Sequence, residues 1–250
     1  DDPDPERTLR IGYLSSDLFD HSVARFMEPI LRGHDHRAFE VHVFSTVAKR
    51  DDVTTRLRRI ERLRWHEVDA LGDAALARRI AAEGIDLLVD LGGHTAHNRL
   101  RVFAYRPAPV AVTYLGYPDT TGLSCIDVRL TDGVADPLGE ADRYASERLA
   151  RLPHVAWCYE PGVEVPLIEP DPRSLTFVSF NALHKVTDAA LDAWARILSR
   201  VPGAVLAFKS WALSEPEVRQ ALLDDCVRHG IDPGRVHVRG FAPTRREHLE

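Results

Sequence analysis

The sequence has 250 residues, of which 44% are hydrophobic, and its 38 acidic and 32 basic side chains are mixed along the chain with a net charge of −6. This length fits one large domain or two small ones, and the lack of a dense basic stripe argues against a nucleic-acid partner. No apolar run reaches the ~18 residues of a membrane span, and no signal peptide opens the chain. The three cysteines are far apart and form no metal or disulfide pattern. We therefore expect a cytoplasmic protein with no membrane partner.

The first part of the chain predicts strands that alternate with helices after an acidic, proline-rich linker at residues 1–8. Strands are expected over residues 9–15, 39–46, 65–68, 85–91, 110–115, 126–131 and 149–158, and helices over residues 22–31, 53–63 and 73–83. Gly84 should end the last of these helices. Five arginines between residues 56 and 64 are interpreted as the solvated face of a helix. The alternation indicates an α/β fold with a mostly parallel sheet.

A second domain is expected after residues 161–173, where four prolines predict a semi-rigid linker. The first domain then covers residues 9–160 and the second begins at residue 174. Strands are expected over residues 176–180, 205–208 and 236–238, and helices over residues 188–199 and 215–229. Residues 244–250 resemble the first turns of a further helix. Three strands are few for such a domain, so we expect the second domain to be cut off in this chain.

Two consecutive strands end in polar loops that contain glycine. The strand at residues 85–91 runs into Gly92, Gly93, His94 and Thr95, and the strand at residues 110–115 runs into residues 116–122. Ligands of open α/β sheets bind at the carboxyl ends of the strands. Asp90 closes a buried strand and needs a partner in the loop or a ligand. The spacing from His94 to His97 could suit zinc, but no third ligand is at hand, so no metal is expected.

Three further loops could carry chemistry. His21 follows the first strand, where it is either a base or hydrogen-bond donor or an incidental residue beside a capping Asp or Ser. In the second domain, Asn181 and Lys185 lie between a strand and a capped helix, which suits a diphosphate. Neither a Walker pattern nor G-x-G-x-x-G is present. The loop at residues 240–243, followed by Arg245 and His248, could seat a base or a ribose.

Several segments together resemble the catalytic region of the protein O-GlcNAc transferase family, in the family's order. They are R-I-G-Y-L-S-S-D-x-x-x-H-S at residues 10–22, G-G-H-T-A-x-N at 92–98, R-P-A-P-V at 106–110, L-G-Y-P-x-T-T-G at 115–122, S-F-N-x-x-x-K at 179–185 and W-A-R-I-L-x-R-V-P at 194–202. Details such as His94-Thr95-Ala96 and Asp119-Thr120-Thr121-Gly122 are more similar to the SPINDLY branch.

The resemblance implies a GT-B architecture of two Rossmann-like domains, with the donor nucleotide mainly on the second. It implies an inverting enzyme that needs no metal or cofactor and moves a sugar to Ser or Thr of intracellular proteins, with tetratricopeptide repeats upstream. The family as a whole favours GlcNAc from UDP-GlcNAc, whereas plant SPINDLY transfers fucose from GDP-fucose. Ala182 and His184 replace a polar and an aromatic residue of the GlcNAc branch, so both donors stay open.

The resemblance also implies residue roles. His21 matches an active-site histidine near the acceptor, and Lys185 matches the lysine that meets the charge of the leaving diphosphate. Either His21 or Asp90 would take the proton of the acceptor hydroxyl. The residues expected to contact sugar or acceptor are His94, Thr95, Pro118, Thr120 and Thr121. The residues expected to contact the nucleotide are Asn181, Lys185, Ala242, His248 and either Arg245 or Arg246.

Other functional classes stay open from the sequence. The chain could be an inactive protein-binding module on the same fold, although the retained His21 and Lys185 argue against this. It could also belong to an enzyme that makes a small-molecule glycoside. Because a later segment that completes the donor site is absent from the sequence, the chain by itself is expected to be inactive.

Overall fold

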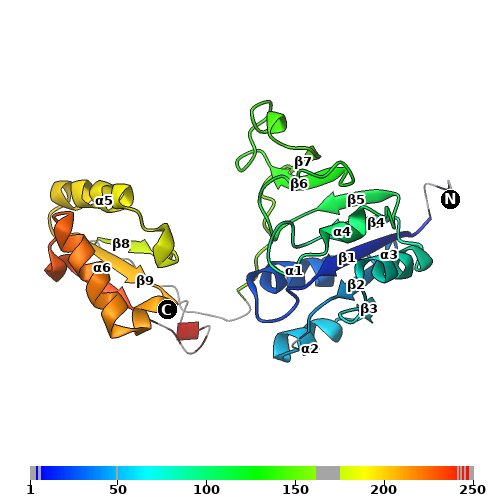
Figure 1. The fold of residues 1–250 in the computed structure, drawn as a ribbon, viewed down its shortest axis with the longest axis horizontal. Helices are drawn as coiled ribbons and strands as arrows, with labels where there is room; N and C mark the ends of the chain where they lie inside the picture. The colour runs from blue at the N-terminus through cyan, green and yellow to red at the C-terminus, as the bar shows by residue number, and fades with distance from the viewer. Residues whose placement is uncertain are drawn as a thin grey trace. The chain divides into compact units, whose positions relative to one another are not determined.

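The computed structural model describes residues 4, 7–48, 50–161, 175–240, 242, 244, 246 and 247. It divides into two compact units, unit 1 (Asp1–Pro161) and unit 2 (Gly162–Glu250), each with its own sheet (Figure 1). The linkers expected at residues 1–8 and 161–173 fall largely outside the described residues, as does the helix expected at residues 244–250. None of the described helices is both long and apolar enough to cross a membrane.

Unit 1 is built on seven parallel strands in the order β3-β2-β1-β4-β5-β6-β7. The strands are β1 (Leu9–Ser15), β2 (Phe39–Ser45), β3 (Leu63–Glu67), β4 (Leu87–Asp90), β5 (Val110–Thr113), β6 (Val128–Asp132) and β7 (Arg148–Leu152). β1 lies in the interior of the sheet, between β2 and β4. Successive residues enter opposite faces, so Tyr13 packs in one core cluster and Leu14 in the other.

Helices cover both faces of this sheet. α1 (Ser22–Gly33) and α2 (Asp52–Arg58) supply Met27 and Leu57 to one cluster, and α3 (Asp73–Ala82) and α4 (Leu100–Phe103) supply Ile80 and Phe103 to the other. These four side chains are completely buried. Full burial of a side chain of this kind contributes ~1.5–3 kcal/mol, so the two clusters fix the helices on the sheet.

Local signals set the ends of several helices. The Nδ1 atom of His21 accepts a hydrogen bond from the Val23 N–H at 3.3 Å and so caps α1. Asp51 and Thr54 bond reciprocally at the start of α2, which is a capping box. Gly84 follows α3 with φ of 64°, which confirms the predicted stop.

Some elements of unit 1 differ from the expectation. The helix expected over residues 53–63 ends at Arg58, because Arg62 turns the chain with φ of 63° and Leu63 then begins β3. The five arginines therefore do not share one helix face, and that interpretation is wrong. The strand expected over residues 149–158 ends at Leu152, and those expected over residues 85–91 and 110–115 are also shorter. The short helices α4 and η1 (Ala141–Arg143) were not predicted.

Unit 2 contains three parallel strands in the order β10-β9-β8. They are β8 (Thr176–Ser179), β9 (Val205–Lys209) and β10 (Val236–Arg239), joined through α5 (Asp188–Arg200) and α6 (Pro216–Arg228). Every expected strand and helix of this unit agrees with the observed bounds to within one residue at each end. The short helices η2 (Leu183–Lys185), η3 (Trp211–Ser214) and η4 (Pro233–Arg235) were not predicted.

Candidate functional site

The carboxyl ends of β1, β4 and β5 form the candidate site of unit 1. β1 pairs with β2 on one side and with β4 on the other, so successive connections leave in opposite directions at the β1–β4 junction. Open α/β sheets bind ligands at such a switch point. The loops after these three strands contain His21, His94 and Thr121. Together with Asp90, the last residue of β4, these loops hold every site residue that the sequence predicts in unit 1.

Asp90 anchors the loop that follows β4. The residue is 2% exposed, and its carboxylate accepts hydrogen bonds from the Gly92 N–H at 3.2 Å, the Gly93 N–H at 2.7 Å and the Thr113 hydroxyl at 2.9 Å. Burial raises the pKa of Asp90, whereas these donors and the charge of His94 lower it, and burial prevails. The loop thus supplies the partner that the sequence analysis required.

Two glycines allow the loops after β4 and β5 to touch. Gly93 has φ of 52°, and a Cβ atom there would lie 2.3 Å from the Cβ of Tyr117. A Cβ atom on Gly116 would lie 1.9 Å from the backbone oxygen of Leu91. Both contacts are closer than carbon or oxygen atoms tolerate, so only glycine permits this approach. The hydroxyl of Thr95 donates to the Gly92 carbonyl at 2.8 Å and therefore also serves the loop.

A hydrogen-bonded chain links His94 to a buried carboxylate. The Nε2 atom of His94 lies 2.7 Å from the Thr121 carbonyl oxygen, and the ring packs edge-on against Tyr117 with 5.4 Å between centroids. Glu147 accepts hydrogen bonds from the Thr121 N–H at 2.7 Å, from the Thr120 hydroxyl at 2.8 Å and from the Thr121 hydroxyl. Glu147 is 5% exposed and was not predicted. Nothing in the local sequence marks this residue, because its partners lie 26 residues or more away.

His21 lies in the loop after β1 and uses one ring nitrogen to bind the start of α1. Its Nδ1 accepts from the Val23 N–H, so in the neutral ring the proton resides on Nε2. The ring also lies beside Phe19, with 5.5 Å between centroids. His21 itself is thus the helix cap, so the alternative of an incidental histidine beside a capping Asp or Ser is wrong. The ring is also a partly exposed hydrogen-bond donor, as the other interpretation allows.

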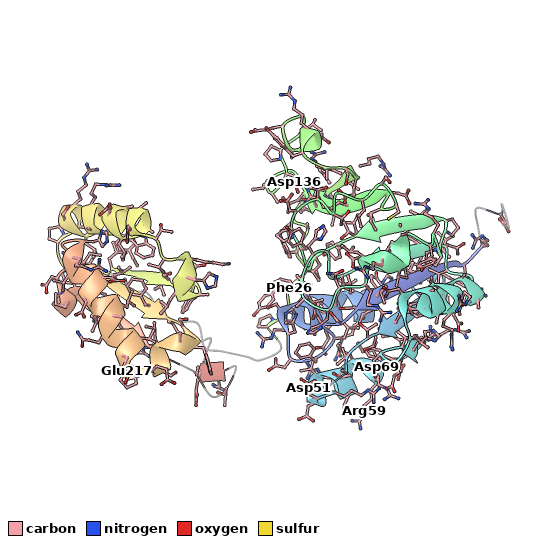
Figure 2. All side chains as sticks on the ribbon, in the orientation of Figure 1. Phe26, Asp51, Arg59, Asp69, Asp136 and Glu217 are labelled. Atoms are coloured by element: carbon pink, nitrogen blue, oxygen red, sulfur yellow. The ribbon has the colours of Figure 1, made fainter. Side chains whose placement is uncertain are left out.

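A buried ion pair supports the loop after β5 from beneath. Arg129 donates to the Pro118 carbonyl at 3.3 Å and to Asp136 at 2.8 Å, and Figure 2 places Asp136 on the segment after β6. Both residues line a cavity of about 30 Å³, which is room for roughly one water molecule. Among the described residues, the buried Nε of Arg129 has no hydrogen-bond partner. Pro118 itself is exposed.

In unit 2 the candidate nucleotide loop runs from β8 to α5. Asn181 and Lys185 are exposed, and the Lys185 ammonium forms no ion pair with any residue in the described part of the chain. Thr187 caps α5 by accepting from the Ala190 N–H at 3.3 Å, close to the expected position. Ala242 is partly buried, and Arg245 and His248 lie outside the described residues. The sequence also predicts that His21 and Lys185 face each other across one cleft. Because each unit is described by itself, this stays a prediction.

Two other features lie away from the strand ends. A hollow of about 500 Å³ is lined by Arg32, Arg56 and Arg59. These residues lie near the C-terminal ends of α1 and α2, and these helix ends lie at the edge of the sheet opposite to the carboxyl ends of the strands. It is therefore separate from the strand-end site.

The second feature is a pair of histidines on β2 and β3. His42 Nδ1 lies 3.1 Å from His66 Nε2, His42 Nε2 lies 3.1 Å from Glu40, and Arg79 donates to His66 Nδ1 at 3.2 Å. Since arginine only donates and a carboxylate only accepts, the hydrogen bonds run from Arg79 through both neutral rings to Glu40. His42, His66 and Glu83 offer ligand atoms within 4.8 Å of one another, but all four ring nitrogens are already satisfied. We assign no metal to this cluster.

Comparison with known proteins adds a family and several relatives. The model of the family described as "Glycosyl transferase family 41" matches residues 2–160. The "Probable UDP-N-acetylglucosamine--peptide N-acetylglucosaminyltransferase SPINDLY" of Solanum lycopersicum is 40% identical over 98% of this chain and 27% of its own length. The SEC protein of Arabidopsis thaliana, with the same description otherwise, is 33% identical over 97% of this chain and 26% of its own length. The chain thus spans about a quarter of these relatives.

Solved structures agree with this picture. A mutant of the O-GlcNAc transferase of Thermobaculum terrenum matches with a TM-score of 0.90 and 36% identity, over 98% of this chain and 46% of that chain. The lipopolysaccharide outer core galactosyltransferase WaaB matches with a TM-score of 0.54 and 12% identity, over 94% of this chain and 69% of its own. The second likeness shows the fold alone.

Proposed function

Because the chain belongs to glycosyl transferase family 41 and has a GT-B fold, we propose that it forms part of an enzyme that transfers a sugar from a nucleotide sugar to Ser or Thr hydroxyls of intracellular proteins. The transfer inverts the anomeric centre and needs no metal. The observation that carries the proposal is the strand-end site of unit 1, where His21, His94 and the loop at residues 116–121 lie at the switch point of the sheet.

The chemistry requires two kinds of group. An acceptor hydroxyl is a poor nucleophile and must lose its proton, and a nucleotide diphosphate leaves with additional negative charge. Exposed, polar side chains at the ends of β1, β4 and β5 suit the acceptor and the sugar. Exposed Lys185 and the N-terminus of α5 suit the diphosphate, because free N–H groups and an ammonium both attract phosphate oxygens.

Lys185 is well suited to this role because its ammonium forms no ion pair with any residue in the described part of unit 2. Had it paired with a surface carboxylate, its loss would cost ~0–1 kcal/mol of stability and nothing in turnover. Among the described carboxylates near α5, Asp188 and Asp192 instead pair with His229. The Lys185 ammonium is therefore available to bind a diphosphate.

The donor that we propose is UDP-GlcNAc, which is named in the descriptions of the SPINDLY and SEC relatives. The alternative is GDP-fucose, suggested by Ala182 and His184 in the nucleotide loop. We also propose that the acceptor is a protein and that tetratricopeptide repeats lie upstream of this chain in the full-length protein.

The test is transfer by the full-length protein from UDP-GlcNAc and GDP-fucose to protein acceptors, with and without EDTA. We expect transfer from UDP-GlcNAc that EDTA leaves unchanged. Lys185→Ala should remove roughly 3–4 kcal/mol of transition-state stabilisation, a loss of at least a hundredfold in rate, at an unchanged melting temperature. Arg196→Ala, an exposed cation on α5, is the matched control and should keep the wild-type rate. Near-wild-type transfer by folded Lys185→Ala would mean that the diphosphate is held elsewhere.

A further inference from the structure

We propose that Nδ1 of His94 accepts the proton of the acceptor hydroxyl, and that Glu147 positions this ring through Thr121. The inference rests on the proposed function and replaces both bases considered from the sequence, His21 and Asp90. It follows from the hydrogen bonds that each candidate already makes, because a base needs a free lone pair within reach of the substrate.

His21 lacks that lone pair. A neutral imidazole has one N–H and one lone pair. The lone pair of His21 lies on Nδ1 and is used by the Val23 N–H at the start of α1. The Nε2 atom carries the proton and can only donate. His21 therefore suits a hydrogen bond to an oxygen of the sugar, the phosphate or the acceptor.

The buried carboxylates at the strand ends are also unsuitable. Asp17, Asp90, Asp132 and Glu147 are at most 8% exposed. Asp90, Asp132 and Glu147 each accept three hydrogen bonds from the protein. An acceptor hydroxyl could reach them only by displacing these donors. Asp119 remains, since it is exposed and accepts from the Thr120 N–H at 2.7 Å.

His94 has the required geometry. A carbonyl oxygen only accepts, so the 2.7 Å contact with Thr121 places a proton on Nε2 and leaves the lone pair of the neutral ring on Nδ1. Within the part of the chain that the structure describes, Nδ1 of His94 has no hydrogen-bond partner, and the side chain is exposed.

Glu147 fixes the carbonyl that holds this ring. It binds the Thr121 N–H and hydroxyl and the Thr120 hydroxyl, and the Thr120 hydroxyl also accepts from the Ser146 N–H at 3.0 Å. The peptide of Thr121 can therefore rotate little, and its oxygen stays directed at His94. Carboxylates that orient a histidine through its other nitrogen act in this way in metal sites and catalytic triads.

The resulting step is balanced. The oxygen of the Ser or Thr hydroxyl forms a bond to the anomeric carbon while its O–H bond breaks, and the proton moves to Nδ1 of His94. The bond from the anomeric carbon to the diphosphate oxygen breaks, and its electron pair leaves with the nucleotide diphosphate. The imidazolium keeps its Nε2–H bond to the Thr121 carbonyl and returns its proton to water afterwards.

Kinetics of the full-length enzyme test the role of His94. General-base catalysis contributes roughly 10²- to 10⁴-fold, so His94→Ala should lower kcat by about that factor, and added imidazole should restore part of it. His97→Asn is the matched control, since His97 is exposed in the same loop and asparagine accepts its φ of 60°. Retained kcat in His94→Ala overturns the proposal. An equally large loss of kcat in Asp119→Asn also overturns the proposal. The same holds if the loss of kcat in His94→Ala is not restored by imidazole and the pH profile of kcat is unchanged.

The role of Glu147 has its own variant. Glu147→Gln keeps the size of the side chain but introduces an NH₂ group that clashes with donors. Misplacing a catalytic group by about 1 Å costs about a hundredfold, so kcat should fall by roughly ten- to a hundredfold with the donor KM little changed. Glu140→Gln, an exposed glutamate before η1, should match the wild type. A Glu147→Gln effect confined to KM overturns the positioning role.

A measurement without catalysis separates this inference from the proposed function. Nitrogen-15 NMR of the 250-residue chain distinguishes the two imidazole tautomers. Neutral His94 should carry its proton on Nε2 in the wild type, and this preference should weaken in Glu147→Gln. A proton on Nδ1 overturns the inference whatever the enzyme transfers. If no donor sugar is transferred but the tautomer is as expected, the proposed function fails and the hydrogen-bonded chain stands.

Discussion

Replacement of Gly93 by alanine tests the contact between the loops after β4 and β5. Two costs add at this position. A left-handed φ of 52° costs a residue with a Cβ atom ~1–2 kcal/mol. The new Cβ would also lie 2.3 Å from the Cβ and 2.9 Å from the Cγ of Tyr117, and overpacking of this kind typically costs ~1–3 kcal/mol. The sum is ~2–5 kcal/mol for Gly93→Ala.

Other glycines of unit 1 separate the two costs. Gly122 has φ of 68° with no atom within 4 Å of the place that a Cβ atom would take, so Gly122→Ala should cost only the ~1–2 kcal/mol of the backbone. Gly133 has neither a positive φ nor a close neighbour, and Gly133→Ala should stay within ~1 kcal/mol of the wild type or be slightly stabilising. Gly116→Ala should cost ~3 kcal/mol or more, because its Cβ meets the Leu91 backbone oxygen, which cannot rotate away.

Calorimetric melting of the whole chain measures these differences. For a domain of about 150–250 residues, 1 kcal/mol corresponds to roughly 2–4 °C. Gly93→Ala should therefore lower the melting temperature of unit 1 by roughly 4–20 °C, and clearly more than Gly122→Ala. Equal shifts for these two variants would show that Tyr117 does not press on Gly93, and the loop contact on which the site geometry depends would be wrong.

Two further predictions concern buried charge in unit 1. Asp136→Ala should destabilise this unit by ~3–5 kcal/mol, because it leaves the Arg129 guanidinium buried without its carboxylate, whereas the double variant Arg129→Met with Asp136→Leu should be much milder; similar melting of both variants would contradict this. The second prediction concerns pH, because burial lowers the pKa of His42 and of His66. Below about pH 6.5 these histidines therefore bind protons in the unfolded chain but not in the folded one. The free energy of unfolding should fall with acidification by up to about 1.4 kcal/mol per pH unit for each histidine. The charged groups that face this pair are Glu40, Arg64, Arg79 and Glu83. Both glutamates have lowered pKa values, so they take up protons only at lower pH than the histidines. His66→Gln should flatten the slope of urea stability between about pH 5 and 6.5, and an unchanged slope would refute the assignment.

The elements that the sequence predicts well carry their own local signals. Gly84 ends α3, Thr187 caps α5, and the strands of unit 2 are bounded by turn residues, so pattern and propensity agree with the fold there. The helix expected over residues 53–63 fails for a tertiary reason. Leu63 and Trp65 pair with Val41 and Val43 of β2, and this pairing outweighs the helical spacing of the arginines before them.

The site is predictable only in part. Strand ends followed by Gly92-Gly93 and Gly116 indicate where a ligand binds, because the topology of a parallel sheet fixes that edge. The roles of single atoms depend on contacts between distant residues. Thr121 meets His94 over 27 residues and Glu147 over 26, and no local pattern encodes which ring nitrogen is left with a lone pair.

The interior position of β1 has a consequence for synthesis on the ribosome. β1 precedes the other strands of its sheet in the sequence. The Arg10 N–H binds the carboxylate of Asp86, 76 residues later in the chain, and β1 pairs with β4 immediately after that residue. At about 5–20 residues per second, the ribosome needs roughly 4–15 s to add that length. During this time β1 can pair with β2 on one edge, while its other edge presents unpaired N–H and C=O groups. The nascent chain thus exposes an adhesive strand for seconds, and chaperones that bind extended apolar segments have their opportunity before Asp90 emerges.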